Sequence, residues 1–386
     1  MLVHITKERL MHALQHVLKA VSVNHPIPIL TGIHIEATAE GLILTGSHTS
    51  MSIEAWIQQD GTAVIVEAAG SIVVPARYFY EIVRKLDDGM IVIDGTESIV
   101  AAISTEGSSI RLCGMDADEY PKRNRSANAA ATYRLRIESE SLKSAIRQVA
   151  TAASTSESRP VLTGVCMSYL GGSELRLTAT DGIRLATCTI PVEIRGSMPQ
   201  SAEFIVSSRS MLDMAGMLDG QGEPIELQAS SDLIIFRTAN LHIQLAPIEG
   251  TFPSTHSIIP RTYQSEITIE TARLQHALER ATVLAGDRIV RMTATREQLG
   301  IVSRTAAIGD GKECVPVAAM EGDEFSLSLN GKMLTDIVRC LAYTYVRLRY
   351  TGERGPIVLQ PTDRDGEGDS SALFLLTPVR TAVQVN

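Results

Sequence analysis

The sequence contains reactive side chains, but their spacing does not build a catalytic set. His48 lies between Ser47 and Ser50, and Asp181 lies three residues before Arg184. Nucleophilic catalysis needs a nucleophile, a base and an orienting group within reach of one another. Neither cluster supplies all three roles, and no GxSxG, HExxH or P-loop motif is present. The sequence therefore favours a protein without catalytic activity, with a repeat-domain enzyme as the alternative.

Cysteine spacing also argues against a metal centre. The five cysteines include no CxxC pair, and their number is odd: Cys113, Cys166, Cys188, Cys314 and Cys340. We expect reduced, mostly buried thiols, no metal and no cofactor. The first residues, MLVHITKERL, lack the apolar run of a signal peptide, and no apolar segment approaches the length of a membrane span. These features predict a cytoplasmic protein.

Length and composition are those of a globular protein with several domains. The chain has 386 residues, of which 44% are hydrophobic and 20% are charged. At roughly 100–200 residues per domain, this length predicts about two to four domains. Only 4% of the residues are aromatic, and Trp56 is the single tryptophan. A carbohydrate- or lipid-binding module, which would use surface aromatics, is therefore the less favoured alternative.

A helical pattern occurs three times at a spacing of 132 residues. Each copy has the i, i+3, i+4, i+7 apolar spacing of an amphipathic helix. The apolar positions are Leu10, Ala13, Leu14 and Val17, then Leu142, Ala145, Ile146 and Val149, then Leu274, Ala277, Leu278 and Ala281. The phrase PILTG at 28–32 returns as PVLTG at 160–164, where we expect the chain to enter a strand. The sequence therefore contains a threefold internal repeat.

Each repeat continues with the same order of elements. Alternating polar and apolar residues predict a strand pair over 41–57, 174–190 and 298–317. A strand then runs into a second helix, with plausible starts at Pro75, at Ser207 or Ser208, and at Asn330. In the third repeat, Leu334, Ile337, Val338 and Leu341 mark its buried face. We predict that each unit reads β-α-β-β-β twice, with two helices among about eight strands.

Two polar segments separate the repeats. PKRNRSANAAAT at 121–132 and TFPSTHSIIPRTYQSE at 251–266 look like junctions. We therefore predict three domains, over 1–126, 127–256 and 257–386. Solenoid repeats are only about 20–50 residues long, so a period this large favours autonomous domains.

Charge is distributed unevenly between helices and the rest of the chain. The six expected helices, over 7–20, 76–86, 141–153, 208–218, 272–285 and 331–341, carry a net charge of +8. Since the whole chain carries −9, the remainder carries −17. A solvated helix face is the simplest explanation. A repeated basic helix layer on an acidic body also suits a polyanion held on one surface. The scarcity of aromatics favours duplex over single-stranded nucleic acid, and no base-reading motif is present.

Six motifs follow one another along essentially the whole chain: KAVSVNHPIPILTGIHI, VPARYFYEIV, SRPVLTGVCMSY, TATDGIRLA, EGTFPSTHSIIP and LLTPVR. Together they resemble the bacterial DNA polymerase III beta subunit family of replicative sliding clamps. The resemblance implies an α+β fold of three repeated DNA-clamp domains, each with two inner helices and outer antiparallel sheets. It further implies that two chains close head to tail into a ring around duplex DNA and tether polymerase and repair proteins, without catalysis. A specialised, repair-associated second clamp is the alternative.

The resemblance also carries residues over to this chain. It implies DNA contacts by Arg77, Arg159, Arg209, Lys19, Asn24, His25, Lys143 and Arg147. It implies a groove for a partner peptide formed by Leu162, Thr180, Gly182, Ile183, Arg184, Leu185, Pro253, Ile258, Leu376, Thr377, Pro378, Val379 and Arg380. It implies a dimer interface formed by Ile110 and Leu112 on one edge and by Val283 and Leu284 on the other.

Partners follow from the same resemblance. The clamp loader, the replicative polymerase and repair proteins would insert short segments that contain Leu and Phe. This sequence departs from the family pattern at four places: Asn24 or His25 replaces a loop Arg, Ile183 replaces a polar residue, Thr377 replaces a larger apolar residue, and TAVQVN follows Arg380. These departures lead us to expect altered peptide selectivity and altered affinity for DNA.

Overall fold

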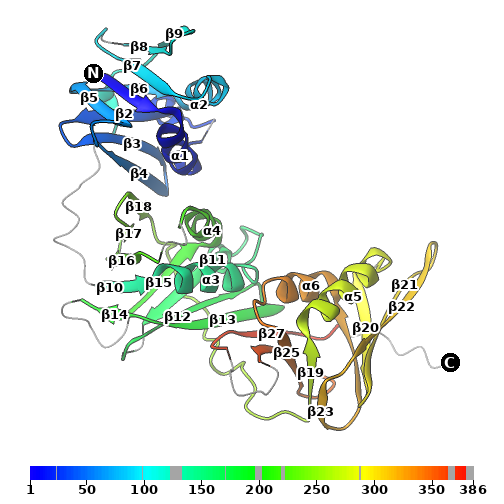
Figure 1. Cartoon of the computed structure of the whole chain (residues 1–386). Helices are drawn as coiled ribbons and strands as arrows, with labels where there is room; N and C mark the ends of the chain where they lie inside the picture. The colour runs from blue at the N-terminus through cyan, green and yellow to red at the C-terminus, as the bar shows by residue number, and fades with distance from the viewer. Residues whose placement is uncertain are drawn as a thin grey trace. The chain divides into compact units, whose positions relative to one another are not determined.

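The computed structural model describes residues 1–22, 24–97, 99–121, 133–169, 171–195, 202–218, 222–286, 288–363 and 370–379. The chain forms two compact units (Figure 1). Unit 1 comprises Met1–Ser139, Glu193–Pro199 and Gly216–Pro247, and unit 2 comprises Glu140–Val192, Gln200–Ala215 and Ile248–Asn386. Most of the first predicted junction, 122–132, and the predicted groove residue Arg380 lie outside the described residues.

The predicted repeat is confirmed, and the described residues of each copy form nine strands where about eight were expected. The first copy contains β1 Leu2–Thr6, α1 Lys7–Val17, β2 Gly32–Thr38, β3 Gly41–His48, β4 Met51–Gln58, β5 Val64–Ala68, β6 Gly70–Pro75, α2 Ala76–Lys85, β7 Met90–Asp94, β8 Val100–Ser104 and β9 Ser109–Cys113. The order is β-α-β-β-β, an additional strand β5, then β-α-β-β-β. The ninth strand is this addition, which pairs with β1 at the sheet edge.

The second copy has the same order. It contains β10 Tyr133–Glu138, α3 Ser139–Ala150, β11 Gly164–Tyr169, β12 Glu174–Thr180, β13 Arg184–Pro191, β14 Glu193–Ile194, β15 Ala202–Ser207, α4 Ser208–Met217, β16 Pro224–Ala229, β17 Ile234–Arg237 and β18 Leu241–Leu245. Its additional strand is β14, which pairs with β10 just as β5 pairs with β1.

The third copy repeats the order once more. It contains β19 Ser265–Glu270, α5 Thr271–Val283, β20 Ile289–Ala294, β21 Gln298–Thr305, β22 Gly309–Pro316, β23 Ala319–Gly322, β24 Phe325–Asn330, α6 Gly331–Arg339, β25 Tyr345–Tyr350, β26 Ile357–Thr362 and β27 Leu373–Leu376. Its additional strand β23 pairs with β19.

The strands in the described part of the chain form four antiparallel sheets. Unit 1 holds a five-stranded sheet, β5-β1-β7-β8-β9, and a nine-stranded sheet, β14-β10-β16-β17-β18-β4-β3-β2-β6. Unit 2 holds a nine-stranded sheet, β15-β11-β12-β13-β27-β26-β25-β19-β23, and a four-stranded sheet, β22-β21-β20-β24. Each nine-stranded sheet therefore joins strands from two neighbouring repeats.

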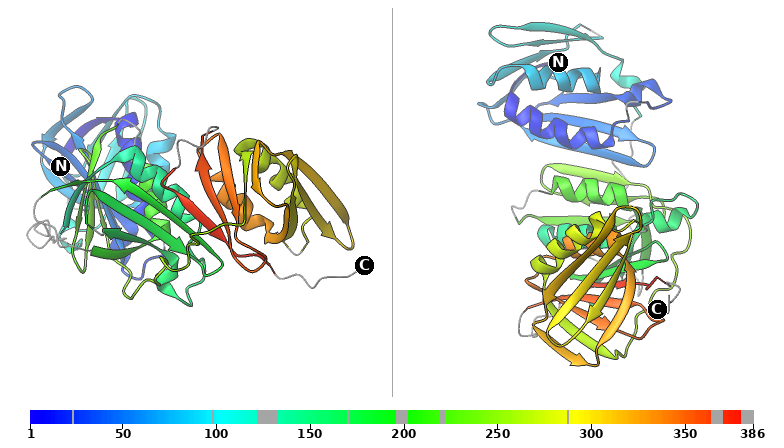
Figure 2. Two further views of the ribbon diagram at one scale, coloured as in Figure 1. Left: turned by 90° about the horizontal axis from the view of Figure 1, so that it is seen from below. Right: turned by 90° about the vertical axis from the view of Figure 1, so that its right-hand side faces the viewer.

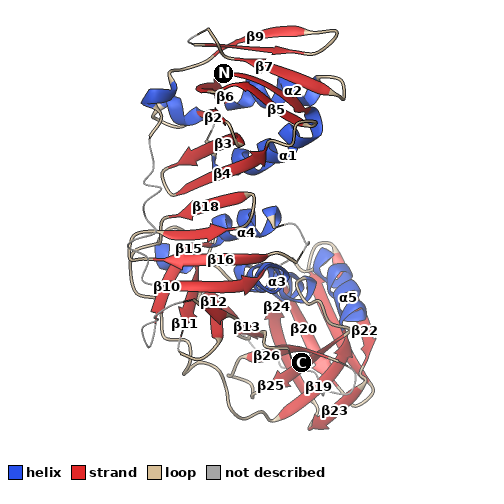
Figure 3. Cartoon of the chain, turned by 60° about the vertical axis from the view of Figure 1, so that its left-hand side comes forward, coloured by secondary structure: helices blue, strands red, loops and turns tan. Residues whose placement is uncertain are grey.

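The helices are buried through the faces that the apolar spacing predicted. All twelve repeated positions of the three first helices are buried, as are Leu334, Ile337, Val338 and Leu341. Within unit 1, α1 contacts α2 and also packs on β3 and β4. Within unit 2, α5 contacts α6. Figure 2 shows the helices from two other sides, and Figure 3 shows α1 with α2 in unit 1. Burial of each stripe against strands explains why the pattern recurs in the sequence.

The helix starts agree with the sequence except at Pro75. The side chain of Asn330 accepts a hydrogen bond of 3.1 Å from the Met333 N–H and caps α6, as expected. The Ser207 hydroxyl accepts from the Ser210 N–H at 3.4 Å at the start of α4. Pro75 was expected in the first turn, but it occupies the N-cap position, one residue before α2. There its missing N–H costs no helical hydrogen bond.

The predicted cysteine environments are only partly confirmed. The five thiols are free, and Cys166 and Cys188 are buried while Cys340 is half-buried. Burial raises the pKa of the Cys166 thiol to about 12 and also raises the pKa of Cys188. Cys113 and Cys314 are exposed because they lie on the edge strands β9 and β22. Among the described residues, no cluster of three or more His, Cys, Asp or Glu could hold a metal ion.

No helix in the described part of the chain is long and apolar enough to cross a membrane.

Candidate functional site

The turn between β12 and β13 forms the centre of the candidate groove. The Thr180 hydroxyl donates to the Arg184 carbonyl at 2.6 Å and accepts from the Gly182 N–H at 3.1 Å. Oδ1 of Asp181 accepts from the N–H groups of Ile183 and Arg184, each at 2.9 Å. Gly182 has a φ of +90°, a conformation that glycine adopts without strain. The Asp-Gly pair therefore builds a rigid turn that presents Ile183.

Strand β27 attaches to this turn from the far end of the chain. Arg184 pairs with Leu376 and Leu185 pairs with Leu375 in the antiparallel ladder. The N–H of Thr377 donates to the Ile183 carbonyl at 3.0 Å, and its hydroxyl donates to the same oxygen at 2.9 Å. The threonine that replaces a larger family residue therefore fastens the end of β27 to the turn.

The apolar residues of the predicted groove separate into a buried wall and an exposed rim. Leu162, Leu185 and Leu376 are buried. Ile183 and Ile258 are 48% and 53% exposed, which is unusual for isoleucine, and Pro253 is exposed as well. Ile259 packs against the cluster of Leu185 and Leu375, so the 253–259 segment reaches the β13–β27 side of unit 2.

The charged residue of the predicted groove is held by internal partners. Nε of Arg184 donates to Oδ2 of Asp181 at 3.1 Å, and its Nη1 lies 3.6 Å from Oδ2 of Asp336 on α6. The side chain of Arg184 is only 12% exposed. Asp336, which is 152 positions from Arg184, was missed because no sequence spacing indicates this contact. Arg184 therefore links the β12–β13 turn to α6, and its side chain is largely buried.

The candidate DNA-contacting cations are mostly exposed, and two of them occupy equivalent places. Arg77 and Arg209 are each the second residue of the second helix in their repeat. Lys332 holds the same place at the start of α6, and it is exposed. The repeat could have revealed Lys332, but its offset from Arg209 is 123 residues instead of 132.

The other candidate cations differ in their environment. Lys19 is exposed on η1 Leu18–Ala20, Arg147 is exposed on α3, and Arg159 precedes η5 Pro160–Thr163. Lys143 pairs with Glu140 at 3.7 Å. Asn24 is exposed, whereas Nδ1 of His25 accepts from the Ile27 N–H at 3.1 Å.

The helices are less basic than the sequence suggested. With the observed bounds, α1 to α6 carry +1, +2, +1, 0, +1 and +1, a net charge of +6 where +8 was expected. The difference arises because Lys19 lies in η1 and Glu140 lies inside α3. Since the whole chain carries −9, the remainder carries −15, so the predicted asymmetry keeps its sign.

The predicted interface residues lie at the free edges of the two smaller sheets. Ile110 and Leu112 are half-buried on β9, the edge of the five-stranded sheet. Val283 ends α5 and is 81% exposed, and Leu284 follows it. A Cβ atom at Gly311 of edge strand β22 would lie 3.4 Å from Leu284 Cδ1, so this helix end adjoins that edge.

Comparison with known proteins matches all three repeats. The family models of the N-terminal, central and C-terminal domains of the DNA polymerase III beta subunit match residues 1–124, 136–254 and 256–369. The beta sliding clamp of Bacillus subtilis (strain 168) is 33% identical over 384 residues, covering 98% of this chain and 99% of that protein. The beta sliding clamp of Halalkalibacterium halodurans is 34% identical over 393 residues, with the same coverage of both proteins.

Solved structures agree with the sequence relatives. The DNA polymerase sliding clamp of Bacillus subtilis has a TM-score of 0.89 at 33% identity and covers 99% of this chain and 100% of its own. A sliding clamp from Pseudomonas aeruginosa bound to griselimycin has a TM-score of 0.88 at 22% identity, covering 99% and 100%, and supports the fold alone. The chain belongs to the DNA polymerase III beta subunit family, the family of the beta sliding clamps.

Proposed function

We propose that two copies of this chain close head to tail into a ring around duplex DNA and act as a processivity factor. The ring would tether the replicative polymerase, the clamp loader and repair proteins without catalysing a reaction, in the cytoplasm. Membership of the sliding-clamp family supports this function. The repeats would be its domains, over 1–126, 127–256 and 257–386.

The pairing of sheet edges carries the proposal of a ring. In unit 1, β4 pairs with β18, and in unit 2, β13 pairs with β27. In both cases the fourth strand of one repeat, which ends its first half, pairs with the last strand of the next repeat. The equivalent strands that have no such partner among the described residues are β22 of the third repeat and β9 of the first repeat, and each lies at the edge of its sheet. Pairing them between two chains would join a four-stranded and a five-stranded sheet into a third sheet of nine.

The two internal seams also predict the register between the chains. Ile53 pairs with Ile243 in one seam, and Ala186 pairs with Phe374 in the other. The pairing within each repeat makes Gly311 of β22 the equivalent of Ile53 in β4 and Ala186 in β13. In the same way, Ile110 of β9 is the equivalent of Ile243 in β18 and Phe374 in β27. Both seams therefore lead to Ile110 opposite Gly311 of the partner subunit.

In that register, Arg111 lies opposite Asp310 of the partner subunit. Arg111 pairs with Glu97 of its own chain. Asp310 is exposed and makes no side-chain hydrogen bond or ion pair with any described residue. Opposite charges directly across an antiparallel pair stabilise it, so this contact would help to select the register. Ile110, Leu112, Val283 and Leu284 would supply the apolar part of the contact.

We infer that DNA contacts come from exposed cations near the helices, without sequence readout. Arg77, Arg209 and, by its equivalent place, Lys332 would begin the second helices of the three repeats as phosphate contacts. The remaining contacts would come from Lys19, Asn24, His25, Lys143, Arg147 and Arg159. Because phosphate contacts release counterions, affinity should fall steeply as salt rises.

We infer that the β12–β13 turn and β27 form a groove for an extended partner peptide. Ile183, Ile258 and Pro253 would form its rim, Leu162, Leu185 and Leu376 its wall, and Thr180, Gly182 and Arg184 its braced turn. Thr377, Pro378, Val379 and Arg380 would complete its C-terminal side. A segment with Gln followed by Leu and Phe residues fits these apolar subsites. The exposed Ile183 favours apolar contacts at the rim over the polar contact that the family pattern implies.

Retention on DNA tests the ring. After loading by a clamp loader, the protein should persist on a closed circular duplex and leave rapidly once that circle is cut to give free ends. Linear DNA blocked at both ends should restore retention, since topology would then hold the ring. Equal retention on closed, cut and blocked DNA would exclude encirclement.

A further inference from the structure

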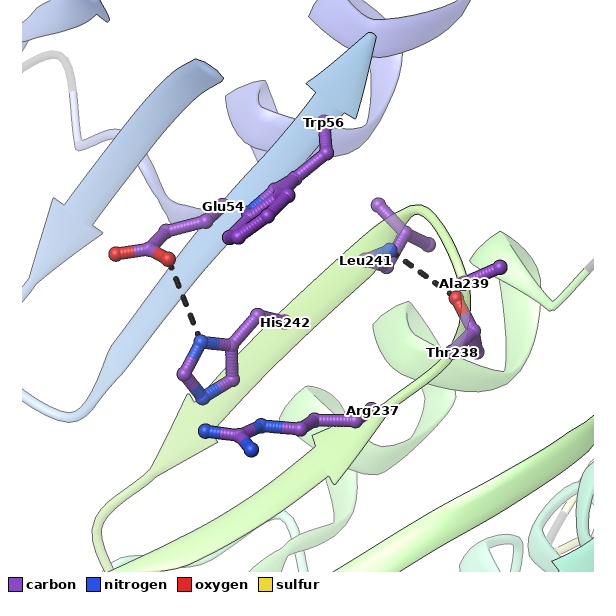
Figure 4. A pocket seen from close by; sticks show the side chains of 7 residues that line it. All are labelled: Glu54, Trp56, Arg237, Thr238, Ala239, Leu241 and His242. Atoms are coloured by element: carbon purple, nitrogen blue, oxygen red, sulfur yellow. Dashed lines mark hydrogen bonds and ion pairs between the residues drawn. The ribbon is translucent and has the colours of Figure 1, made fainter. Parts of the chain in front are cut away.

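A small cavity opens where the two repeats of unit 1 share a sheet. Strand β4 pairs with β18 from Ala55 opposite Leu241 to Met51 opposite Leu245. At the Ala55 end of this seam lies a cavity of about 270 Å³ (Figure 4). Its lining comes from both strands and the β17–β18 hairpin: Glu54, Trp56, Arg237, Thr238, Ala239, Leu241 and His242.

The floor of the cavity is a buried contact between a carboxyl group and an imidazole, each of which already has a partner. Oε2 of Glu54 lies 3.3 Å from Nδ1 of His242, and each side chain is only 10% exposed. Nε2 of His242 lies 3.4 Å from Nε2 of Gln244. A cationic ligand would have to displace His242 from Glu54, so the floor is poorly suited to bind an amine.

Two groups of the lining remain available to a ligand. Arg237, on β17 directly opposite His242, is half-buried, and its guanidinium makes no hydrogen bond or ion pair with any described residue. Trp56 is 45% exposed although it lies in a central strand of a nine-stranded sheet. Figure 4 shows both side chains at the cavity, on either side of the Glu54–His242 pair. The guanidinium and the indole are therefore both accessible to a ligand in this cavity.

The backbone around the cavity is held in place. The Trp56 N–H donates to the Asn240 carbonyl at 2.8 Å, which ties β4 to the tip of the β17–β18 hairpin. The Thr238 hydroxyl accepts from the Leu241 N–H at 3.1 Å, and the Thr238 N–H donates to the Leu241 carbonyl at 3.0 Å. Indole and guanidinium therefore project from fixed positions, as a preformed binding site requires.

We propose that this cavity binds a carboxylate attached to a single planar aromatic ring. The guanidinium fork of Arg237 matches a carboxylate in a planar, bidentate arrangement. The ring would stack on Trp56 and contact Leu241 and Ala239, which supply the apolar part of the lining. A cavity of this volume holds one ring and its acid group, because it lies just below the range of about 300–1,000 Å³ that drug-sized ligands occupy.

The charge of the lining selects a monoanion. Glu54 contributes one negative charge and Arg237 one positive charge, whereas His242 is charged only if it is protonated. A phosphate dianion would place two further negative charges near the buried Glu54, which like-charge repulsion disfavours. A carboxylate adds one charge and leaves the Glu54–His242 pair in place. The source can be a free aromatic acid or the C-terminal aromatic residue of a peptide.

Tryptophan fluorescence provides a direct readout, because Trp56 is the only tryptophan of the chain. Titration of the full-length protein with benzoate should change the Trp56 emission saturably. Benzamide keeps the ring without the charge, and acetate keeps the charge without the ring. We expect each of them to bind about tenfold more weakly than benzoate or worse. Equal responses to benzoate and benzamide, or no saturable response to benzoate, would overturn the proposal.

A second arm identifies the source and the role of Arg237. Acetyl-Gly-Phe with a free C-terminus is compared with its C-terminal amide and with benzoate. If the peptide with the free C-terminus binds most tightly, the natural ligand is the C-terminal residue of a peptide. If benzoate binds most tightly, the natural ligand is a free aromatic acid. Arg237→Gln should weaken binding of the preferred probe about tenfold. The matched control, Arg136→Gln, changes an arginine of the same sheet outside the cavity and should leave the affinity unchanged. Equal losses in both variants, at unchanged thermal stability, would also overturn the proposal.

This inference is independent of ring formation and DNA binding. Neither Arg237 nor Trp56 is among the proposed groove, interface or DNA-contacting residues. Retention on circular DNA can therefore fail while benzoate binding succeeds, and the reverse outcome is equally possible.

Discussion

Arg184 and Asp181 form a hydrogen-bonded ion pair of 3.1 Å within one tight turn, and Asp181 also holds the N–H groups of that turn. The same arginine reaches Asp336 on α6. Its guanidinium, which projects from β13, therefore connects the β12–β13 turn with α6. The side chain that the resemblance assigned to the partner site thus holds the β12–β13 turn against α6. Any peptide bound beside it would meet a prearranged surface, which lowers the entropic cost of binding.

Asp181→Ala should weaken peptide binding while the chain stays folded. It removes two backbone hydrogen bonds and leaves Arg184 with only the more distant Asp336, so Ile183 loses its fixed position. We expect about tenfold weaker binding of a peptide with Gln followed by Leu and Phe, measured by calorimetry. Asp232→Ala, which changes an exposed acid on the β16–β17 turn, is the control. Unchanged affinity in Asp181→Ala would place the partner site elsewhere.

The dimer should respond to charge exchange at the predicted seam. Arg111→Asp alone would face Asp310 of the partner subunit with a like charge, and should weaken the dimer about tenfold or more in sedimentation. Combining Arg111→Asp with Asp310→Arg should restore most of the loss, because the pair is rebuilt in reverse. A double variant that is weaker than either single variant would show that the register is wrong.

Apolar contacts at the same edges should matter more than the charges. Ile110→Asp with Leu112→Asp should give monomers. Burial of each apolar side chain in the dimer would contribute about 1.5–3 kcal/mol to its stability, and an aspartate loses this contribution. Leu212→Asp is a matched control, because Leu212 is an exposed apolar residue of α4 and belongs to neither edge strand. Sedimentation of the Ile110 and Leu112 variant as an unchanged dimer would contradict the proposed interface.

The phosphate contacts should be visible in the salt dependence of binding. Arg77→Gln combined with Arg209→Gln should reduce the slope of log affinity against log salt by about 2, since each lost phosphate contact removes about one unit. Adding Lys332→Gln should reduce the slope further if all three second helices contact DNA. Arg176→Gln, on strand β12, is the control. A slope that the three substitutions leave unchanged would exclude these helix starts from the DNA contact.

Periodicity predicted the elements of this fold well because each repeat is built from local patterns. Leu10, Leu142 and Leu274 occupy the same buried place, and the spacing alone indicated it. The additional strands β5, β14 and β23 were not predicted, because they are short and depend on pairing with the first strand of their repeat. The pairing of β4 with β18 also escaped prediction, since it joins segments about 190 residues apart.

The candidate groove could be assigned from the resemblance but not from its geometry. Asp181 and Gly182 predict a turn by themselves, and the turn is present. Burial of Leu376, withdrawal of Arg184 and the Thr377 hydrogen bonds to Ile183 all depend on tertiary contacts with β13 and α6. No sequence spacing encodes these contacts.

The glycine that ends the repeated segments PILTG and PVLTG should not tolerate substitution by a larger residue. The prolines begin the 3₁₀ turns η2 Pro28–Thr31 and η5, and each threonine hydroxyl donates to the proline carbonyl at 2.7 Å. Gly32 and Gly164 then start β2 and β11 against a neighbouring strand. A Cβ atom at Gly164 would lie 2.4 Å from Ile205 Cγ2 and 3.0 Å from the Val206 carbonyl oxygen.

Gly164→Ala should therefore destabilise the protein by about 1–3 kcal/mol, the range for forced overpacking. Gly216→Ala is the matched control, because a Cβ atom at this α4 position meets nothing within 4 Å. That control should instead stabilise the helix by up to about 1 kcal/mol. Thermal unfolding distinguishes the two, and equal melting temperatures for both variants would refute the close-packing explanation.

Asp60 lies in the connection between β4 and β5, and the stability that its side chain contributes should depend on pH. Its Oδ1 accepts from the N–H groups of Thr62, Ala63 and Val64 at 2.9, 2.7 and 3.0 Å. These bonds, with that from Thr62 the largest, lower the pKa of Asp60 from 3.8 to about 2. Because the folded pKa lies below the unfolded one, the stabilisation is complete above about pH 4 and is lost as the pH falls toward 2. The melting-temperature gap between wild type and Asp60→Asn should be constant near neutral pH and shrink across that acid range. A gap for Asp60→Asn that persisted unaltered to pH 2 would mean that the charge of Asp60 does not stabilise the turn.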